Sequence, residues 1–284
     1  MTKLREITVE NAAIEWLQKL GYSYKPGKEL IREPKKAALK EDLFQFLSAN
    51  YSHVPTTVLE EVATIFLTQT GMNLDTRNRE FHLKMTKGIS LSWKDKNDKE
   101  FAEHFYPINF NEPEKNSFIC ANQVVIIGKN TRKPDLIIYI NGLPLVVFEF
   151  KNMYDSDTGV AEGHIQIQHY TLDIPQLFDF NAISVVSDGM EALHGMYSSS
   201  LKWFAPWKST DGIETINKYE LQLQTLLNGL FPKTTLLKYI KHFIFHENHN
   251  SKIVKKGAKY HQFWGVNEAV ESTLENIQPK GDGR

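Results

Sequence analysis

The sequence predicts an α/β protein in which helices flank a mixed sheet and a helical extension follows toward the C-terminus. Four apolar runs have strand length: 122–128 (NQVVIIG), the two halves of 133–152, and 182–189. A helix candidate at 158–172 separates the last two runs, and a crossover of this kind is expected to be right-handed. Beyond residue 213, the segments 217–231 and 234–245 carry apolar side chains at helical spacing, which predicts the extension.

The N-terminal region is predicted to be mainly helical. Residues 8–20, 39–50 and 57–70 each read as a helix with an apolar face. Residues 76–100 differ, because they combine many charges with two short alternating pieces, one of them ISLSW. A polar turn at 94–99 would join these pieces as a pair of strands.

Composition limits the class of protein. The 284 residues are 41% hydrophobic and 24% charged with a net charge of −1, which is typical of a soluble globular chain. A protein that only coats nucleic acid is usually more basic, so any such contact should be a local patch. Cys120 is the sole cysteine, which excludes an internal disulfide framework and a zinc site of several thiolates. A reducing compartment and, without a signal peptide or a long apolar run, a cytoplasmic location are expected.

The stretch KPDLIIYINGLPLVVFEFKN, residues 133–152, predicts a β-hairpin around Asn141-Gly142. With a regular two-residue loop, Asp135 would pair with Phe148, and Glu149 would lie on the opposite face of the sheet. One extra residue or a bulge would bring Asp135 and Glu149 to the same face. Pro144 has no N–H and disturbs a regular ladder just after the turn, which favours such an irregularity.

On that interpretation Asp135, Glu149 and Lys151 converge at one end of the hairpin. Two neighbouring carboxylates repel each other unless a cation lies between them, and oxygen ligands with room for water suit Mg²⁺. Lys151 could stabilise a phosphate or orient an attacking water. The trio therefore suits phosphodiester hydrolysis, whereas a surface ion pair worth about 0–1 kcal/mol is the alternative.

The predicted helix 158–172 carries Gln166 and Tyr170 on one side, because they are four residues apart. An amide and a phenol at that spacing could donate to successive phosphate oxygens of a duplex. An ordinary polar helix face is the alternative.

Together, Pro134-Asp135, Glu149-x-Lys151 and Gln166-x-x-x-Tyr170 resemble the motifs of PD-(D/E)xK nucleases that add Q-x-x-x-Y. Further segments resemble the N-terminal nuclease region of the restriction subunit in type I restriction–modification systems. They are NQ at 122, QIQHYTLDIPQLFDFNAISVVSDG and WFAPWK. The resemblance implies a PD-(D/E)xK restriction-endonuclease-like core and an endonuclease that cleaves double-stranded DNA with Mg²⁺. It also implies an ATP-driven translocase in the rest of the subunit, with methyltransferase and specificity subunits as partners.

The resemblance also implies roles for particular residues. Asp135 and Glu149 would be metal ligands together with the Phe150 carbonyl, and Lys151 would be the catalytic lysine. Gln166 and Tyr170 would be the accessory pair. Such nucleases often carry an acid on the first helix, for which Glu10, beside the apolar face of that helix, is the candidate.

The C-terminal residues KYHQFWGVNEAVESTLENIQPKGDGR resemble the entrance of the first motor domain, where a glutamine before a helix contacts adenine. Gln262 occupies the matching place. This predicts an endonuclease domain at 1–230, followed at 231–284 by a helical linker and the beginning of a motor domain. The chain contains no G-x-x-x-x-G-K-[ST] phosphate loop, so we expect this piece not to hydrolyse ATP.

Other features are open to two interpretations. Lys129, Arg132 and Lys133 near Asp135, and the run at 252–259, could contact phosphates or be solvated faces. HENH at 246–249 is expected to be a surface turn rather than a metal site. Two other functions also remain open, a docking module without catalysis and a stand-alone resolvase-like nuclease.

Overall fold

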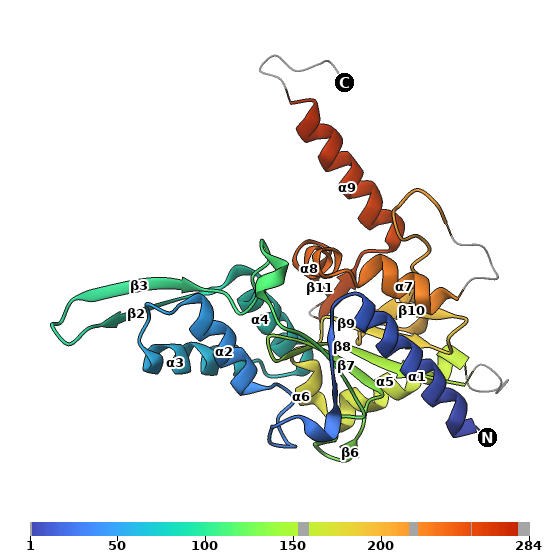
Figure 1. Cartoon of the computed structure of the whole chain (residues 1–284), viewed down its shortest axis with the longest axis horizontal. Helices are drawn as coiled ribbons and strands as arrows, with labels where there is room; N and C mark the ends of the chain where they lie inside the picture. Colours follow the sequence, from blue (N-terminus) through green and yellow to red (C-terminus); the bar gives the residue numbers. More distant parts are fainter. Residues whose placement is uncertain (1, 153–158, 216–220, 251, 278–284) are drawn as a thin grey trace.

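The computed structural model describes residues 2–152, 159–215, 221–250 and 252–277. Within these residues a six-stranded sheet has the order β1-β4-β7-β8-β9-β10 (Figure 1). Its strands are β1 (Ser23–Pro26), β4 (Phe118–Asn122), β7 (Leu136–Ile140), β8 (Leu143–Phe150), β9 (Ile183–Ser187) and β10 (Ala192–Gly195). The pairs β1–β4 and β8–β9 are parallel and the others antiparallel, so the predicted mixed sheet is confirmed.

Helices cover both faces of this sheet. They are α1 (Thr2–Lys19), α2 (Lys40–Asn50), α3 (Thr56–Leu67), α4 (Leu74–Lys87), α5 (Gly159–Asp173), α6 (Pro175–Phe178), α7 (Gln222–Leu230), α8 (Lys233–His242) and α9 (Tyr260–Glu275). Helix α5 connects the parallel strands β8 and β9, as predicted for 158–172. On β8, Glu149 contacts α5 while Phe148 packs against Phe231 at the end of α7. Because neighbouring strand residues point to opposite faces, α5 and α7 lie on opposite sides of the sheet.

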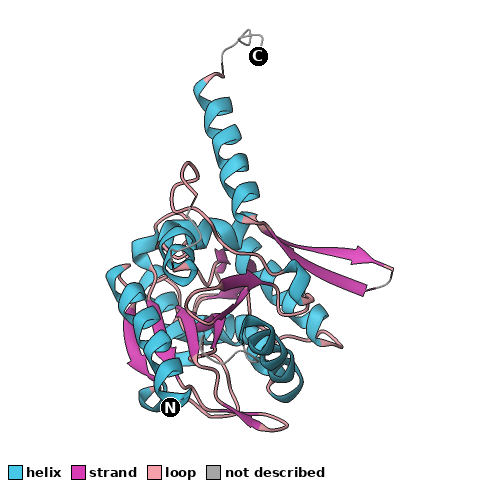
Figure 2. Cartoon of the chain, turned by 90° about the vertical axis from the view of Figure 1, so that its right-hand side faces the viewer, coloured by secondary structure: helices cyan, strands magenta, loops and turns pink. Residues whose placement is uncertain are grey.

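Short elements complete the described chain. They are the hairpins β2 (Ile89–Lys94) with β3 (Glu100–Phe105), β5 (Ile126–Ile127) with β6 (Thr131–Arg132), and β11 (Ile244–His249) with β12 (Lys252–Gly257), and the 3₁₀ turns η1 (Gly27–Glu29), η2 (Pro113–Lys115) and η3 (Leu201–Trp203). Figure 2 shows α9 standing out from the body of the protein. None of the helices in the described ranges combines the length and the apolar character that crossing a bilayer requires.

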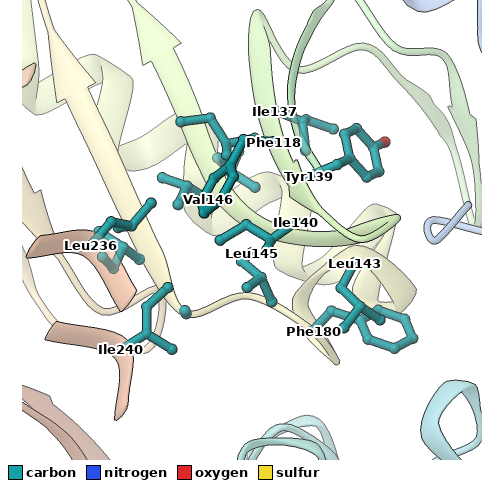
Figure 3. Close-up of a cluster of buried hydrophobic side chains, with 14 of the residues drawn as sticks. Phe118, Ile137, Tyr139, Ile140, Leu143, Leu145, Val146, Phe180, Leu236 and Ile240 are labelled. Carbon is teal, nitrogen blue, oxygen red and sulfur yellow. The ribbon is translucent and has the colours of Figure 1, made fainter. Parts of the chain in front are cut away.

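The core lies between the central strands and the helices (Figure 3). Ile137, Ile140 and Val146 of the hairpin are fully buried, and Leu236 and Ile240 of α8 belong to the same buried cluster. Strands β7 and β8 are buried along their whole length, which explains why they read as continuous apolar runs. A charged side chain at the end of β8 is therefore conspicuous.

Several predictions of local structure were wrong. Residues 74–87 form helix α4, which was not predicted, and Asn73 and Thr76 form a capping box at its start. Its buried face includes Asn78 and His82, which hide the apolar periodicity. No single strand spans 122–128: β4 ends at Asn122, Gln123 takes φ 53° and turns the chain away, and within the rest of this segment only Ile126–Ile127 form a short strand, β5.

Further along the chain, the helix expected at 234–245 ends at His242, and HENH lies on strand β11 instead of a turn. The helices expected at 8–20, 39–50 and 57–70, and the strand pair around the turn 94–99, are present. Residues 217–220 of the helix expected at 217–231, and residues 153–158 between β8 and α5, lie outside the described residues.

Candidate active site

A bulge in the β7–β8 hairpin decides which charged side chains share a face. The turn consists of Asn141 and Gly142 alone, with φ values of 49° and 79°. Tyr139 then pairs with Pro144 but Ile138 pairs with Val146, so Leu145 is an extra residue on β8. The next pairs shift accordingly, and Leu136 lies opposite Phe148. Asp135 consequently comes to the level of Glu149 and not of Phe148, which confirms the predicted irregularity.

Asp135 is held at the start of β7 by two donors. The Phe150 backbone N–H donates to Asp135 Oδ2 at 2.7 Å, and the Gln123 side-chain amide donates to Oδ1 at 3.2 Å. Burial raises the pKa of the Asp135 carboxyl to about 6, although both hydrogen bonds and the Lys151 charge act in the opposite direction. The carboxyl is thus placed beside the end of β8.

Glu149 is the most enclosed acid of the site, with 4% of its surface exposed. Its Oε1 lies 2.7 Å from Lys151 Nζ, and its Oε2 accepts a hydrogen bond from the Tyr170 hydroxyl at 2.9 Å. Burial raises the pKa of Glu149 to about 8, and the nearby Asp135 charge adds to this increase. Because the charge of Asp135 raises the pKa of Glu149, a cation between the two acids would be stabilising.

The accessory pair on α5 differs from the prediction in its orientation. The Tyr170 side chain is buried, and its hydroxyl points to Glu149 and not into solvent where a phosphate would approach. The Gln166 amide hydrogen-bonds the same hydroxyl. Close packing brings the helix near enough, because a Cβ on Gly163 would lie only 3.3 Å from the Val186 side chain. The pair therefore fixes the glutamate.

Glu10 reaches the same end of the sheet from α1, and only 6% of it is exposed. Asn122 donates to its Oε1 and Gln123 to its Oε2, both at 2.6 Å. Gln123 therefore joins Glu10 to Asp135 through one amide nitrogen. Sequence reasoning selected Glu10 but missed Gln123, which it placed inside a strand; the dipeptide NQ at the end of an apolar segment was the available signal.

A magnesium ion fits the chemistry of this donor set. Asp135, Glu149 and the Phe150 carbonyl offer hard oxygen atoms, and Mg²⁺ keeps several waters rather than requiring a complete protein cage. Within the described ranges, no three His, Cys, Asp or Glu side chains are grouped closely enough to hold a metal by themselves, so the Phe150 carbonyl and water would have to complete the coordination. The protein contribution would be two carboxylates and one backbone oxygen.

Gln262 does not belong to this cluster. It lies on α9, where its side-chain oxygen accepts from the Lys259 N–H at 2.8 Å. It lines a hollow of about 830 Å³ whose apolar walls include Tyr239, Phe243 and Phe245. The adenine contact expected for Gln262 stays a prediction.

The fold and the site together define an α/β protein with an acid-and-lysine cluster where strands of a mixed sheet end. Residues 3–202 match the family described as "Type I restriction enzyme R protein N terminus", and the chain belongs to this family.

Two curated relatives extend the similarity over nearly the whole chain. The chain is 32% identical over 294 residues to the "Type I restriction enzyme HindI endonuclease subunit" of Haemophilus influenzae, which covers 99% of this chain and 28% of the relative. It is also 32% identical over 302 residues to the "Putative type I restriction enzyme MjaIXP endonuclease subunit" of Methanocaldococcus jannaschii, which covers 97% of this chain and 28% of the relative. The chain thus spans about a quarter of the length of these relatives.

Proposed function

We propose that this chain is the endonuclease domain of a type I restriction enzyme subunit and hydrolyses phosphodiester bonds of double-stranded DNA with Mg²⁺. The observation that carries the proposal is the bulge at Leu145, which brings Asp135 to the level of Glu149 and Lys151. A PD-(D/E)xK core with Gln166 and Tyr170 as accessory residues would account for this arrangement. Family membership and the named endonuclease relatives support the same conclusion.

Each residue has a role that follows from its contacts. Asp135, Glu149 and the Phe150 carbonyl would hold Mg²⁺, which when bound supplies positive charge at the scissile phosphate and makes an attacking water more acidic. Lys151 lies 2.7 Å from Glu149, so its ammonium is placed to turn from the carboxylate to a phosphate oxygen. Tyr170 keeps Glu149 in place.

Glu10 and Gln123 support the aspartate from the other side. Gln123 donates to both carboxylates, which reduces their repulsion and fixes the distance between α1 and the start of β7. An ion pair with a purely structural purpose needs only Glu149 and Lys151. It does not explain why Asp135 and Glu10 are also directed to this end of the sheet.

In a subunit as long as the relatives, the part outside this chain would add DNA translocation and ATP hydrolysis. We propose that it translocates DNA with ATP, that Gln262 contacts the adenine, and that methyltransferase and specificity subunits bind to it in the cytoplasm. Cleavage of DNA would then follow translocation. The domain limits 1–230 and 231–284 belong to the same proposal.

Metal titration tests the site in the chain itself. Isothermal titration with Mn²⁺ or Mg²⁺ should give binding to the wild-type protein that Glu149→Ala abolishes. Glu80→Ala is a matched control, because Glu80 also pairs with a lysine, Lys84, at 2.7 Å but lies away from the site. Absence of any metal response in the wild type would favour a docking module without catalysis.

Cleavage is tested in the assembled restriction enzyme. Lys151→Ala and Asp135→Ala should abolish DNA cleavage there while ATP hydrolysis and translocation continue, and Lys84→Ala should affect none of the three. Cleavage at the normal rate in either site variant would contradict the assignment.

A further inference from the structure

Two basic segments that are distant in the sequence lie side by side near the candidate active site. Residues 25–36 contribute four exposed lysines and residues 128–133 contribute two. We call these lysines the basic tract: Lys25, Lys28, Lys35, Lys36, Lys129 and Lys133. Glu29 and Glu33 are the only acids in the two segments, whereas the whole chain has a net charge of −1. Positive charge is thus concentrated on these two segments.

The two segments are fastened to each other by backbone contacts. Ile127 N–H donates to the Pro34 carbonyl at 2.9 Å. The Gln176 side chain, at the start of α6, donates to the carbonyls of both Ile127 and Lys35, at 2.9 and 3.3 Å. Figure 1 shows the loop that follows β1 running beside β6. The backbones of the two segments are therefore held beside each other.

The basic tract begins where the acid cluster lies. Strand β1 ends at Pro26, which pairs with Asn122, the residue that donates to Glu10. A Cβ on Gly27 would come within 2.4 Å of the Asn122 carbonyl oxygen, so the chain passes very close to this strand end. On the other segment, Lys133 precedes Pro134 and Asp135 directly. The first segment thus follows the end of β1, and the second precedes the start of β7, where Asp135 lies.

The arginines of these segments are already engaged, unlike the lysines. Arg132 Nε donates to Asp173 Oδ2 at 2.6 Å, and Arg32 donates to the Lys36 carbonyl at 2.6 Å and to the Val125 carbonyl. Within the described ranges, no ammonium group of the basic tract has a carboxylate within 4 Å. These six exposed cations are available to an anionic ligand.

Electrostatics indicates which ligand fits. Glu10, Asp135 and Glu149 present carboxyl groups at the site, and each of them, when ionised, opposes the approach of a phosphodiester. A substrate with many phosphates overcomes this when neighbouring cations bind the phosphates on either side. Flexible lysines contact backbone phosphates without reading bases.

We propose that the basic tract is the surface on which the phosphate backbone of duplex DNA lies when it enters the site. The inference rests on the proposed nuclease function and adds the path of the substrate. It predicts binding that is independent of sequence and strongly dependent on salt, since each lysine–phosphate contact releases counterions.

Fluorescence anisotropy with a labelled duplex of arbitrary sequence, in EDTA, tests the tract without any cleavage. The variant Lys25→Ala/Lys28→Ala/Lys133→Ala should bind more weakly than the wild type. The slope of log K against log salt should fall in magnitude by about 0.9 for each phosphate contact removed. Lys35→Ala/Lys36→Ala should have a smaller effect in the same direction.

A matched control removes the same charge elsewhere. Lys94→Ala/Lys96→Ala/Lys99→Ala also lowers the net charge by three, but these lysines lie on the β2–β3 hairpin. The control should bind DNA like the wild type. An equal loss in both triple variants, an unchanged affinity in the tract variant, or no salt-dependent binding by the wild type would each overturn the inference. Failure of the metal site would appear separately, as cleavage that survives Glu149→Ala.

Discussion

The Tyr170 hydroxyl donates a 2.9 Å hydrogen bond to Glu149 Oε2, so a helix on one face of the sheet fixes an acid at the end of a buried strand. Burial raises the pKa of Tyr170 above its usual range, and the phenol therefore remains a donor. Lys151 binds the other oxygen of the same carboxylate. Glu149 is consequently held from two directions before any ligand arrives.

Tyr170→Phe should weaken metal binding without unfolding the protein. The variant keeps the ring but leaves one carboxylate oxygen of Glu149 without its donor, and loss of such a supporting hydrogen bond typically costs about 10- to 100-fold in metal affinity. Isothermal titration with Mn²⁺ measures the change. Tyr239→Phe is the control, because Tyr239 is also buried and donates to a carbonyl, that of Ala258, outside the site. Equal metal affinity in wild type and Tyr170→Phe would contradict the role.

Gln123→Ala should increase the amount by which Mg²⁺ raises the Tm of the protein. Without metal, the Gln123 amide is the donor shared by Glu10 and Asp135, and its removal leaves these two carboxylates to repel each other. With metal the acids have a cation, so the loss matters less. The increase in Tm on adding Mg²⁺ should therefore be larger in the variant than in the wild type.

The matched control is Gln168→Ala, which also removes a part-buried amide hydrogen bond, from Gln168 Nε2 to the Tyr197 carbonyl. Its increase in Tm with Mg²⁺ should equal that of the wild type. If Mg²⁺ raised the Tm less in Gln123→Ala than in Gln168→Ala, Gln123 would be assisting metal binding and not compensating for the absence of the metal.

Lys255→Met should stabilise the protein at neutral and acidic pH. Burial lowers the pKa of Lys255 to about 7, against the charge of Asp75. An unfolded lysine titrates near about 10.4, so folding carries a penalty that is complete below pH 7 and disappears as pH rises toward 10.4. The gain in Tm should be largest at pH 6 and smallest near pH 10, at about 2–4 °C for each kcal/mol. Lys256→Met, at the exposed neighbouring position, should show no such trend.

His82→Gln should make the protein more resistant to acid. Burial lowers the pKa of His82 to about 3, and the nearby Lys255 charge lowers it further. An unfolded histidine binds its proton near about pH 6.5, so stability is lost as pH falls from 6.5 toward 3. Glutamine does not titrate, and the decline in Tm over this range should be shallower. A decline in Tm that is as steep in His82→Gln as in the wild type would contradict this role.

The hairpin and its acids were predictable because their signals are local. Asn141-Gly142 specifies a tight turn, Pro144 indicates an irregular ladder, and period-two alternation converts that irregularity into a face for Asp135. The same holds for Tyr170, since helical spacing places it with Gln166. Its contact with Glu149 was not predictable, because it depends on how closely α5 approaches β8.

The remaining errors in the predicted structure and site arose where contacts between distant parts of the chain determine the structure. Gln123 acquires its role only when α1 brings Glu10 beside it, and its left-handed backbone interrupts what reads as one strand. Helix α4 buries Asn78, which donates to the carbonyls of Phe178 and Asn181, so a polar residue takes an apolar position. Strand β11 forms by pairing with β12 and not by its own alternation.

Because Leu145 is a single extra residue on β8, the alignment of Asp135 with Glu149 depends on the number of residues in this hairpin. Inserting or deleting one residue between Asp135 and Glu149 would send one acid to the far side of the sheet. Changes by two residues would restore the alignment. Tolerance to length changes in this loop should therefore alternate between odd and even, a pattern that a set of loop variants would reveal directly.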